Sequence, residues 1–457
     1  MSTDNLAAVI LAAGKGTRMK SEQSKVLHQI AGHPLAYYPV HLCQTLGCEK
    51  TVMVVGHQAQ QVEAAFSDQP VSFVLQEEQL GTGHALQVTA SAFEGFSGTL
   101  LLLCGDVPLL REQTLRQLIA RHRAEHSSVT VLTACMDNPF GYGRIVRAAD
   151  GIEKIVEQKD ATDEEKKLQE INTGIYAFEA PLVFDLLQKI GRDNAQGEYY
   201  LTDIISLAKA AGHRVGACVL EDAAESMGIN DRVQLAEAAR ILQQRINRQH
   251  MLNGVTLRDP ATTYIDAAVV IDSDSVIEAN CHLRGATRIG RHCTIQTGSV
   301  IENCCLGDHA HIKPGSILED SQLGPHCTIG PMAHLRPGTL LEGHNKLGNF
   351  VETKKAVLGL RSQASHLTYI GDAELGCDIN LGCGTITCNY DGVNKHKTVI
   401  EDGVFVGSDT QLIAPVTLGR NCLIGAGSTI TKDVPPDALA LSRCEQKMIK
   451  GWRKRKK

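Results

Sequence analysis

Two stretches near the start of the chain carry residue types suited to phosphate chemistry. Residues 14–19 read Gly-Lys-Gly-Thr-Arg-Met directly after an apolar run, so their backbone N–H groups, Lys15 and Arg18 could bind phosphates. The spacing is not that of a G-x-x-x-x-G-K-[ST] loop, and a simple strand-to-helix turn explains the stretch equally well. Asp106 follows a second apolar run, where a carboxylate either ends a strand or binds Mg²⁺ beside a phosphate site.

Three stretches in the second half of the chain interrupt a regular repeat with polar groups. Residues 352–355 read Glu-Thr-Lys-Lys, residues 365–372 contain His366 and Tyr369, and residues 388–397 break the repeat outright. A loop inserted in a repeat protein usually lies on its binding face. Residue type alone favours a structural role for any one of the 18 histidines, because an imidazole is more often packed than catalytic.

The repeat itself has a period of six residues and extends from about residue 265 to residue 430. Aliphatic residues return at this interval, for example at Ile289, Ile295 and Ile301, and the residue two positions earlier is small. Residues two apart share a face of a strand, so each hexapeptide is a short strand with one small and one large side chain inward. The pattern predicts a parallel β-helix whose coils stabilise each other.

Many of the 15 cysteines fall within this repeat, and none forms a C-x-x-C pair. Cys293, Cys304, Cys327 and Cys422 occupy the small inward position, where a thiol is a compact apolar group. We therefore expect reduced cysteines that pack the core, in preference to metal ligands or disulfides.

Apolar runs alternate with amphipathic segments in the first part of the chain. We expect strands at residues 7–13, 51–55, 71–75, 99–104 and 129–134, and helices at residues 58–66, 84–93 and 113–125. This alternation predicts a three-layer α/β domain with a mostly parallel sheet. Ligands of such domains bind beyond the carboxyl ends of the strands.

A helix is expected between the two regions, with Asp231 near its start and with Val233, Ala236, Ile241 and Leu242 on one face. The predicted division is an α/β domain at residues 1–230, a linker helix at 231–252 and a repeat domain at 253–457. Two or three domains agree with a length of 457 residues.

The net charge of −6 gives no reason to expect nucleic acid binding. Residues 450–457 form a basic tail, which we interpret as a solvated end in preference to a phosphate or coenzyme contact. No apolar run is long enough to span a membrane, and the first apolar run leads into the glycine loop without the form of a signal peptide. We expect a cytoplasmic protein without membrane or nucleic acid partners.

Motifs in the first half resemble a known family. Leu11-Ala-Ala-Gly14-Lys-Gly-Thr-Arg18-Met19 with Lys25 is similar to the signature of sugar-phosphate nucleotidyltransferases, and further motifs follow in the family's order: Gln79-Leu-Gly81-Thr82-Gly-His84, Gly105-Asp106, Gly141-Tyr-Gly143-Arg and Glu170-Ile-Asn172-Thr-Gly174. With the hexapeptides, nearly the whole chain resembles the bacterial bifunctional N-acetylglucosamine-1-phosphate uridyltransferases and glucosamine-1-phosphate N-acetyltransferases. The resemblance implies a Rossmann-like nucleotidyltransferase domain, a linker helix and a left-handed parallel β-helix.

The resemblance also implies a UTP and UDP-N-acetylglucosamine site. Its residues are Leu11, Ala12, Ala13, Gly14, Lys25, Gln76, Gly81, Thr82, Cys104, Gly105, Asp106, Gly143, Glu157, Asn172 and Asn230. Lys25 and Arg18 would act on phosphates as catalytic cations, and Gln76 would read uracil. Gly143, Glu157 and Asn172 would hold the N-acetylglucosamine moiety, and Asp106 and Asn230 would bind Mg²⁺. Ser24 stands where the family usually has Pro, which would loosen the turn before Lys25 without removing its charge.

In the β-helix, the resemblance implies that His366 is the general base of acetyl transfer and that Glu352 orients its ring. Glucosamine 1-phosphate would bind Arg336, Lys354, Tyr369 and Asn380, and acetyl-CoA would contact Cys383, Asn389, Tyr390, Ser408, Ala426 and Arg443. An imidazole suits a base that must take a proton from an amine near neutral pH. Some relatives have Ala at the position of Cys383, which matters little if the contact is made by the backbone.

The implied reactions are acetyl transfer from acetyl-CoA to glucosamine 1-phosphate, then uridylyl transfer from UTP to N-acetylglucosamine 1-phosphate with loss of pyrophosphate. The product would supply peptidoglycan and lipopolysaccharide synthesis, and the resemblance implies a homotrimer. Two alternatives stay open. The β-helix could be an oligomerisation module of a monofunctional nucleotidyltransferase, or it could be a metal hydratase or bare scaffold, for which His309, His311, His326 and His334 lack acidic companions.

Overall fold

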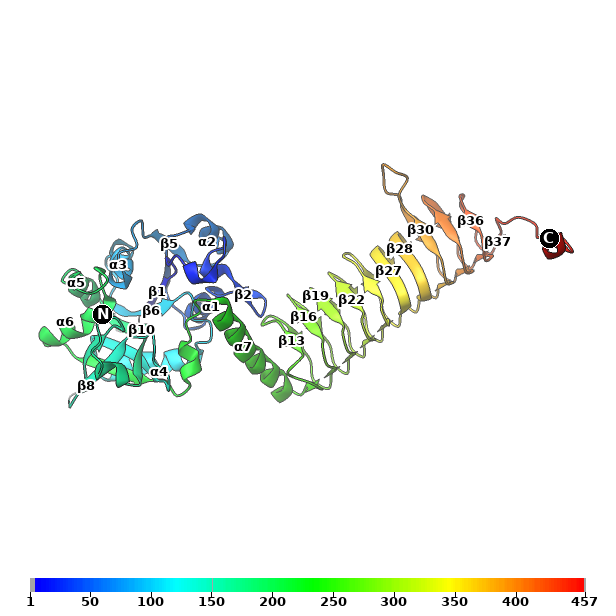
Figure 1. Cartoon of the computed structure of the whole chain (residues 1–457). Coiled ribbons are helices and arrows are strands. Elements are labelled where there is room, and N and C mark those ends of the chain that lie inside the picture. Colours follow the sequence, from blue (N-terminus) through cyan, green and yellow to red (C-terminus); the bar gives the residue numbers. More distant parts are fainter. Residues whose placement is uncertain (1–4, 150, 456–457) are drawn as a thin grey trace. The chain divides into compact units, whose positions relative to one another are not determined.

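The computed structural model describes residues 5–149 and 151–455. The chain divides into two compact units, Met1–Leu242 and Gln243–Lys457. Each unit has a hydrophobic core of its own. Figure 1 shows the first as helices around a sheet and the second as a stack of strands.

The first unit is built on a mixed sheet in which most strands are parallel. Along the sheet the strands are β11 (Val215–Val219), β7 (Val129–Cys135), β10 (Glu170–Ala180), β6 (Gly98–Cys104), β1 (Leu6–Leu11), β4 (Lys50–Val55) and β5 (Ser72–Leu75). Of these seven strands, β10 runs antiparallel to its neighbours β6 and β7. The antiparallel pair β8 (Arg144–Ala148) and β9 (Gly151–Val156) is joined to β10 through β8. The predicted α/β fold is therefore confirmed.

Both faces of this sheet are buried, as expected for a three-layer domain. Along β1, Ala8 and Ile10 pack into one core and Ala7 and Val9 into another, because successive side chains of a strand point to opposite faces. The covering helices are α1 (Tyr37–Thr45), α2 (Ala59–Ala65), α3 (Thr82–Gln87), α4 (Glu112–Ala124), α5 (Leu182–Leu187) and α6 (Ile204–Ala210).

The prediction of a single helix at residues 84–93 is wrong. Helix α3 ends at Gln87, and a 3₁₀ turn follows at Ala90–Phe93. Thr89 donates its hydroxyl to the carbonyl of Leu86 at 2.7 Å. Such a local side-chain bond competes with continuation of the helix.

Helix α7 (Arg232–Leu252) crosses the boundary between the units. Asp231 caps its start, because Oδ1 accepts hydrogen bonds from the backbone of Val233 and Gln234, both at 2.9 Å. The expected apolar face was partly wrong, since Val233 is 78% exposed. The residues that pack on the first unit are Leu235, Ala238, Ala239, Ile241 and Leu242, which follow the helical spacing set by the cap.

The second unit is a parallel β-helix with three strands in each coil. Its strands run from β12 (Thr256–Leu257) to β37 (Leu439–Ala440), and most strands pair with the third strand further along the chain. The long strands β27 (Lys346–Leu358) and β28 (Gln363–Leu375) each follow almost a whole coil. The aliphatic residues and the small residues two positions before them form one continuous core, as predicted.

The cysteines at the small inward position of the repeat, Cys293, Cys304, Cys327 and Cys422, are buried free thiols, whereas Cys305 and Cys383 are exposed. Burial raises the pKa of Cys304 to about 12 and that of Cys327 to about 11. A thiol in this state is neutral and packs as a small apolar group, as the sequence predicted.

One corner of the β-helix carries a column of stacked imidazoles. His292, His309, His326 and His344 all have positive φ, a conformation in which His is enriched among residues other than glycine. Their ring centroids lie 4.6–5.0 Å apart. These rings therefore pack on each other along the corner.

Residues 441–453 are exposed. The last two residues of the predicted basic tail, 456 and 457, lie outside the described residues. Among the helices of the described residues, none has the length and apolar character required to cross a membrane.

Candidate active sites

A cavity of about 310 Å³ opens at the carboxyl ends of β1 and β6 in the first unit. It brings together most of the residues predicted for nucleotide binding: Leu11, Ala12, Ala13, Gly14, Lys25, Gln76, Gly81, Thr82, Cys104 and Asp106. They come from the loops after β1, β5 and β6 and from the start of α3. This is the place where ligands bind in α/β domains.

Lys25 connects two predicted ligands of a metal ion. Its ammonium forms an ion pair with Oδ2 of Asp106 and donates to Oδ1 of Asn230 at 3.3 Å. A carboxylate and an amide oxygen thus converge on one cation. Oxygen donors of this kind also suit Mg²⁺, so the two side chains fit the ion that the sequence predicted.

The predicted sugar residues form a second group beside the cavity. The backbone N–H of Asn172 donates to the carbonyl of Gly143 at 2.9 Å. The side-chain Oδ1 of Asn172 accepts a hydrogen bond from the Tyr176 hydroxyl at 2.9 Å. A Cβ on Gly143 would lie 3.5 Å from Oε1 of Glu157. Burial raises the pKa of Glu157, opposed by a hydrogen bond from Thr202.

Several lining residues were missed by sequence reasoning. Gln79 and Glu198 line the cavity, and Tyr199 receives a backbone hydrogen bond from Gly83 at 2.8 Å. Gly81 has φ +111°, and a Cβ there would lie 2.6 Å from the Tyr199 carbonyl. The polar run at residues 197–203 was the signal that could have indicated this segment.

Besides Asn230 and the sugar residues, Arg18 and Gly105 also stand apart from the lining. Arg18 is exposed and does not line the cavity. Gly105 does not line it either, but its backbone N–H donates to the Leu11 carbonyl at 2.9 Å and joins the two loops. Burial and the nearby Asp106 carboxylate raise the pKa of Cys104 to about 12, so this thiol is a neutral part of the wall.

In the β-helix, β27 and β28 place the predicted base. Asn349 and His366 are in register, and Nδ1 of His366 lies 2.9 Å from Oδ1 of Asn349. An amide oxygen can only accept, so Nδ1 is the donor of this bond, and in the neutral ring Nε2 is the nitrogen with the lone pair. Glu352, which was expected to orient this ring, instead pairs with Arg336 at 2.8 Å.

Cations gather further along the same strands, where Lys354 is in register with Gly371 and Glu352 with Tyr369. Arg336 and Lys354 occupy equivalent positions on adjacent coils, one residue after the paired Leu335 and Thr353. Contact with the Lys395 amine lowers the pKa of Lys354, and Arg336 adds to this effect. Sequence reasoning named the loop that carries Lys395 but not Lys395 itself. Two adjacent ammonium groups indicate a site for an anion.

The predicted coenzyme residues form a column on successive coils. His366, Cys383, Ser408 and Ala426 each lie two residues after aliphatic residues that are in register: Ala364, Leu381, Val406 and Ile424. Arg443 reaches the end of this column, where Nη1 donates to the Ala426 carbonyl at 3.0 Å.

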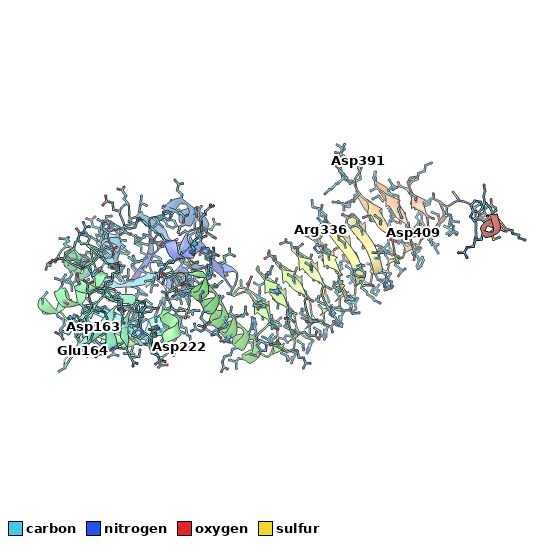
Figure 2. All side chains as sticks on the ribbon, in the orientation of Figure 1. Asp163, Glu164, Asp222, Arg336, Asp391 and Asp409 are labelled. Carbon is cyan, nitrogen blue, oxygen red and sulfur yellow. The ribbon has the colours of Figure 1, made fainter. Side chains whose placement is uncertain are left out.

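Asn389 and Tyr390 come from the loop between β30 (Ile386–Cys388) and β31 (Thr398–Ile400). Figures 1 and 2 show this loop projecting from the coils, with Asp391 on it and Arg336 on the coils. Asn389 is anchored by a hydrogen bond to Asp372. Tyr390 is 60% exposed.

Asn380 is not brought to the other predicted glucosamine 1-phosphate residues. It lies on β29 (Asn380–Leu381), which pairs with the first part of β28 and with β32 (Phe405–Val406). Tyr369 lies on the middle part of β28, which pairs with β30. These strands belong to different sides of the coil, so one chain does not present both side chains to one ligand.

Comparison with known proteins supports a transferase in each unit. Residues 8–168 match the MobA-like NTP transferase domain, residues 265–366 the GMPPB C-terminal domain, and residues 397–432 the bacterial transferase hexapeptide repeats. These matches bear out both predicted types of domain.

Relatives match along the whole chain. The bifunctional protein GlmU of Syntrophotalea carbinolica is 64% identical, with 100% of this chain and 98% of the relative covered. GlmU of Pelobacter propionicus is 56% identical over 99% of both chains, and GlmU of a Geobacillus species is 50% identical over 96% of this chain and 95% of the relative. The chain therefore belongs to the bifunctional GlmU family, as the sequence motifs predicted.

Proposed function

We propose that the chain makes UDP-N-acetylglucosamine by two reactions at independent sites. The β-helix acetylates glucosamine 1-phosphate with acetyl-CoA, and the α/β unit transfers uridylyl from UTP to N-acetylglucosamine 1-phosphate. The observation that carries the proposal is that the candidate residues form two groups, each within one compact unit. The domain assignment that follows is residues 1–230 for uridylyl transfer, 231–252 for the linker and 253–457 for acetyl transfer.

For uridylyl transfer the protein must position the two substrates, and it need not supply a nucleophile. The sugar phosphate oxygen attacks the α-phosphorus, a P–O bond forms, and the bond to pyrophosphate breaks. Lys25 lies in the cavity beside Asp106, where its ammonium can neutralise charge that develops on the phosphates. Asp106 and Asn230 would hold Mg²⁺, which supplies additional positive charge when bound. Gln76 would bind the base, and Gly143, Glu157 and Asn172 the sugar.

Acetyl transfer requires a base for an amine. Nε2 of His366 takes a proton as the glucosamine nitrogen attacks the thioester carbonyl. The C–N bond forms, the C–S bond breaks, and the departing thiolate receives the proton from the imidazolium. Asn349 favours the tautomer in which Nε2 is free, so it is a positioning residue in the place expected for Glu352.

The cations near Tyr369 would hold the phosphate of glucosamine 1-phosphate. Arg336, Lys354 and Lys395 bring positive charges together, and their mutual repulsion depresses the pKa of Lys354. A bound dianion relieves that repulsion. Cys383, Ser408, Ala426 and Arg443 would contact the coenzyme along the column, with Asn389 and Tyr390 beside it.

A second copy of the chain would complete this site. Asn380 lies in register with Phe405, which is in register with Leu423, and Leu423 with Leu439. These three apolar side chains are 43–62% exposed. An exposed apolar column beside a predicted substrate residue suits an interface between copies, which would fit the homotrimer implied by the family resemblance. We place the protein in the cytoplasm, where its product would serve cell-wall synthesis.

Two assays on the purified protein test the proposal. One measures CoA thiol released from acetyl-CoA with glucosamine 1-phosphate, and the other measures pyrophosphate released from UTP, Mg²⁺ and N-acetylglucosamine 1-phosphate. We expect both signals. Pyrophosphate without thiol would support the alternative, a monofunctional nucleotidyltransferase whose β-helix only oligomerises.

A further inference from the structure

A second cavity in the α/β unit has no role in either reaction. Its volume is about 530 Å³, and it shares no lining residue with the nucleotide cavity. The end of α4, β8, the start of β9, the turn after α6 and the edge strand β11 contribute its walls. The volume lies within the range of sites for small molecules, roughly 300–1,000 Å³.

Positive side chains dominate the lining. Among the described residues, the lining carries the cations Arg121, Arg147, Lys209 and Arg214 and the carboxylate of Glu125. Arg147 is paired with Glu170 and Lys209 also has a partner, which leaves Arg121 and Arg214 as the two guanidinium groups beside Glu125. Two arginines share that carboxylate, with Nε of Arg121 at 3.0 Å and Nη2 of Arg214 at 3.8 Å from its oxygens. One carboxylate does not neutralise two guanidinium groups, so positive charge remains at the cavity.

A buried hydroxyl without a partner lies behind the wall. Ser127 is 4% exposed, and its Oγ has no hydrogen-bond partner among the described residues. A Cβ on Gly216, a lining residue, would lie 2.9 Å from this Oγ. A buried hydroxyl left unpaired is unfavourable, and Gly216 is the lining residue directly in front of it.

We propose that this cavity binds a small anion that carries a phosphate group, at a site separate from the nucleotide cavity. The planar guanidinium groups of Arg121 and Arg214 match the oxygens of a phosphate. Inorganic phosphate alone would leave much of the cavity empty, so the natural ligand has an organic part as well.

The cavity is connected to the proposed sugar site by two strands. Arg147 lies on β8 and pairs at 2.6 Å with Glu170 on β10. Glu170 is two residues before Asn172, which is bonded to Gly143 just before β8. An anion that competes for Arg147 would act on both strands. We therefore expect the bound anion to change the KM for N-acetylglucosamine 1-phosphate. This expected change in KM rests on the proposed function, whereas binding of the anion to the second cavity does not.

Chemical modification of the unaltered protein tests the binding. Phenylglyoxal reacts with accessible guanidinium groups, and peptide mass spectrometry gives a rate for each arginine. Arg116 is a matched control, because it forms the same i,i+4 pair on α4 with Glu112, at 2.7 Å, that Arg121 forms with Glu125. We expect inorganic phosphate, at ionic strength held constant with chloride, to slow modification of Arg121 and Arg214 but not of Arg116. Equal effects at all three arginines, or no effect, would overturn the proposal.

A variant provides a second measurement. The side chain of Arg214 is 62% exposed, so Arg214→Gln should fold. Loss of one guanidinium should raise the phosphate concentration that half-protects Arg121 by about tenfold. Unchanged protection of Arg121 in this variant would contradict a shared site. Unchanged uridylyl transfer in phosphate buffer would overturn only the connection to the sugar site.

Discussion

The two units assemble their sites in different ways. In the α/β unit, the cavity collects residues from loops that are far apart in sequence, such as Gly14, Gln76 and Asp106. In the β-helix, Asn349, His366 and Cys383 occupy equivalent places on successive coils. The first site depends on the ends of strands meeting at one edge of a sheet, and the second depends on a constant register. Each site can therefore be damaged without the other.

The largest expected effect is that of His366→Ala on acetyl transfer. Loss of a general base should lower kcat by about 10²–10⁴-fold. Uridylyl transfer should be unchanged, because its cavity lies wholly in the other unit. CoA and pyrophosphate release, measured on one preparation, check both statements, and equal loss of the two activities would contradict separate sites.

Asp106→Ala should produce the opposite pattern. The change leaves Lys25 with only Asn230 and removes a predicted oxygen ligand of Mg²⁺, so uridylyl transfer should fall by about 10²–10³-fold. Acetyl transfer serves as the internal control. If excess Mg²⁺ restored the full rate, Asp106 would contribute only to metal affinity.

A substitution in the core of the β-helix should destabilise that unit and leave the stability of the α/β unit unchanged. Ile329→Ala removes a fully buried side chain of the β-helix and should lower its free energy of unfolding by about 2–5 kcal/mol. On heating, acetyl transfer should then be lost at a lower temperature than uridylyl transfer. Ile317→Ala, at a side chain that is 38% exposed, is the control and should change stability by about 0.5 kcal/mol or less.

The smallest effect concerns the cations of the β-helix. Lys395→Met should raise the KM for glucosamine 1-phosphate by about tenfold, through the loss of one charge-assisted contact. The Lys395 amine lowers the pKa of Lys354, so its removal raises that pKa. The alkaline rise in KM, which follows deprotonation of Lys354, should move to higher pH in the variant. If KM rose at the same alkaline pH in the variant as in the unaltered protein, the two lysines would not interact.

Much of this arrangement could be predicted from the sequence because its signals are local. The hexapeptide period fixes which side chains face the core, and Ile289 and Ile295 are buried accordingly. The glycine loop after β1 and the acid after β6 follow apolar runs, and parallel strands bring both to one edge.

The rest depends on contacts between distant segments. Glu198 reaches the nucleotide cavity from a segment without regular structure, and no period marks it. Asn349 meets His366 only because two coils stack in register. The face of α7 was partly misjudged because its inward residues are set by packing against distant segments, such as Ile30 and Leu109.

The central claim is that the two sites work independently, and a mixing experiment tests it directly. His366→Ala and Asp106→Ala proteins are supplied separately, and then together, with glucosamine 1-phosphate, acetyl-CoA, UTP and Mg²⁺, and UDP-N-acetylglucosamine is measured. Each variant alone should make almost none, whereas the mixture should make it readily, because the acetylated intermediate can leave one protein and enter the other. A mixture of folded variants that remained inactive, or either variant active alone, would contradict the account.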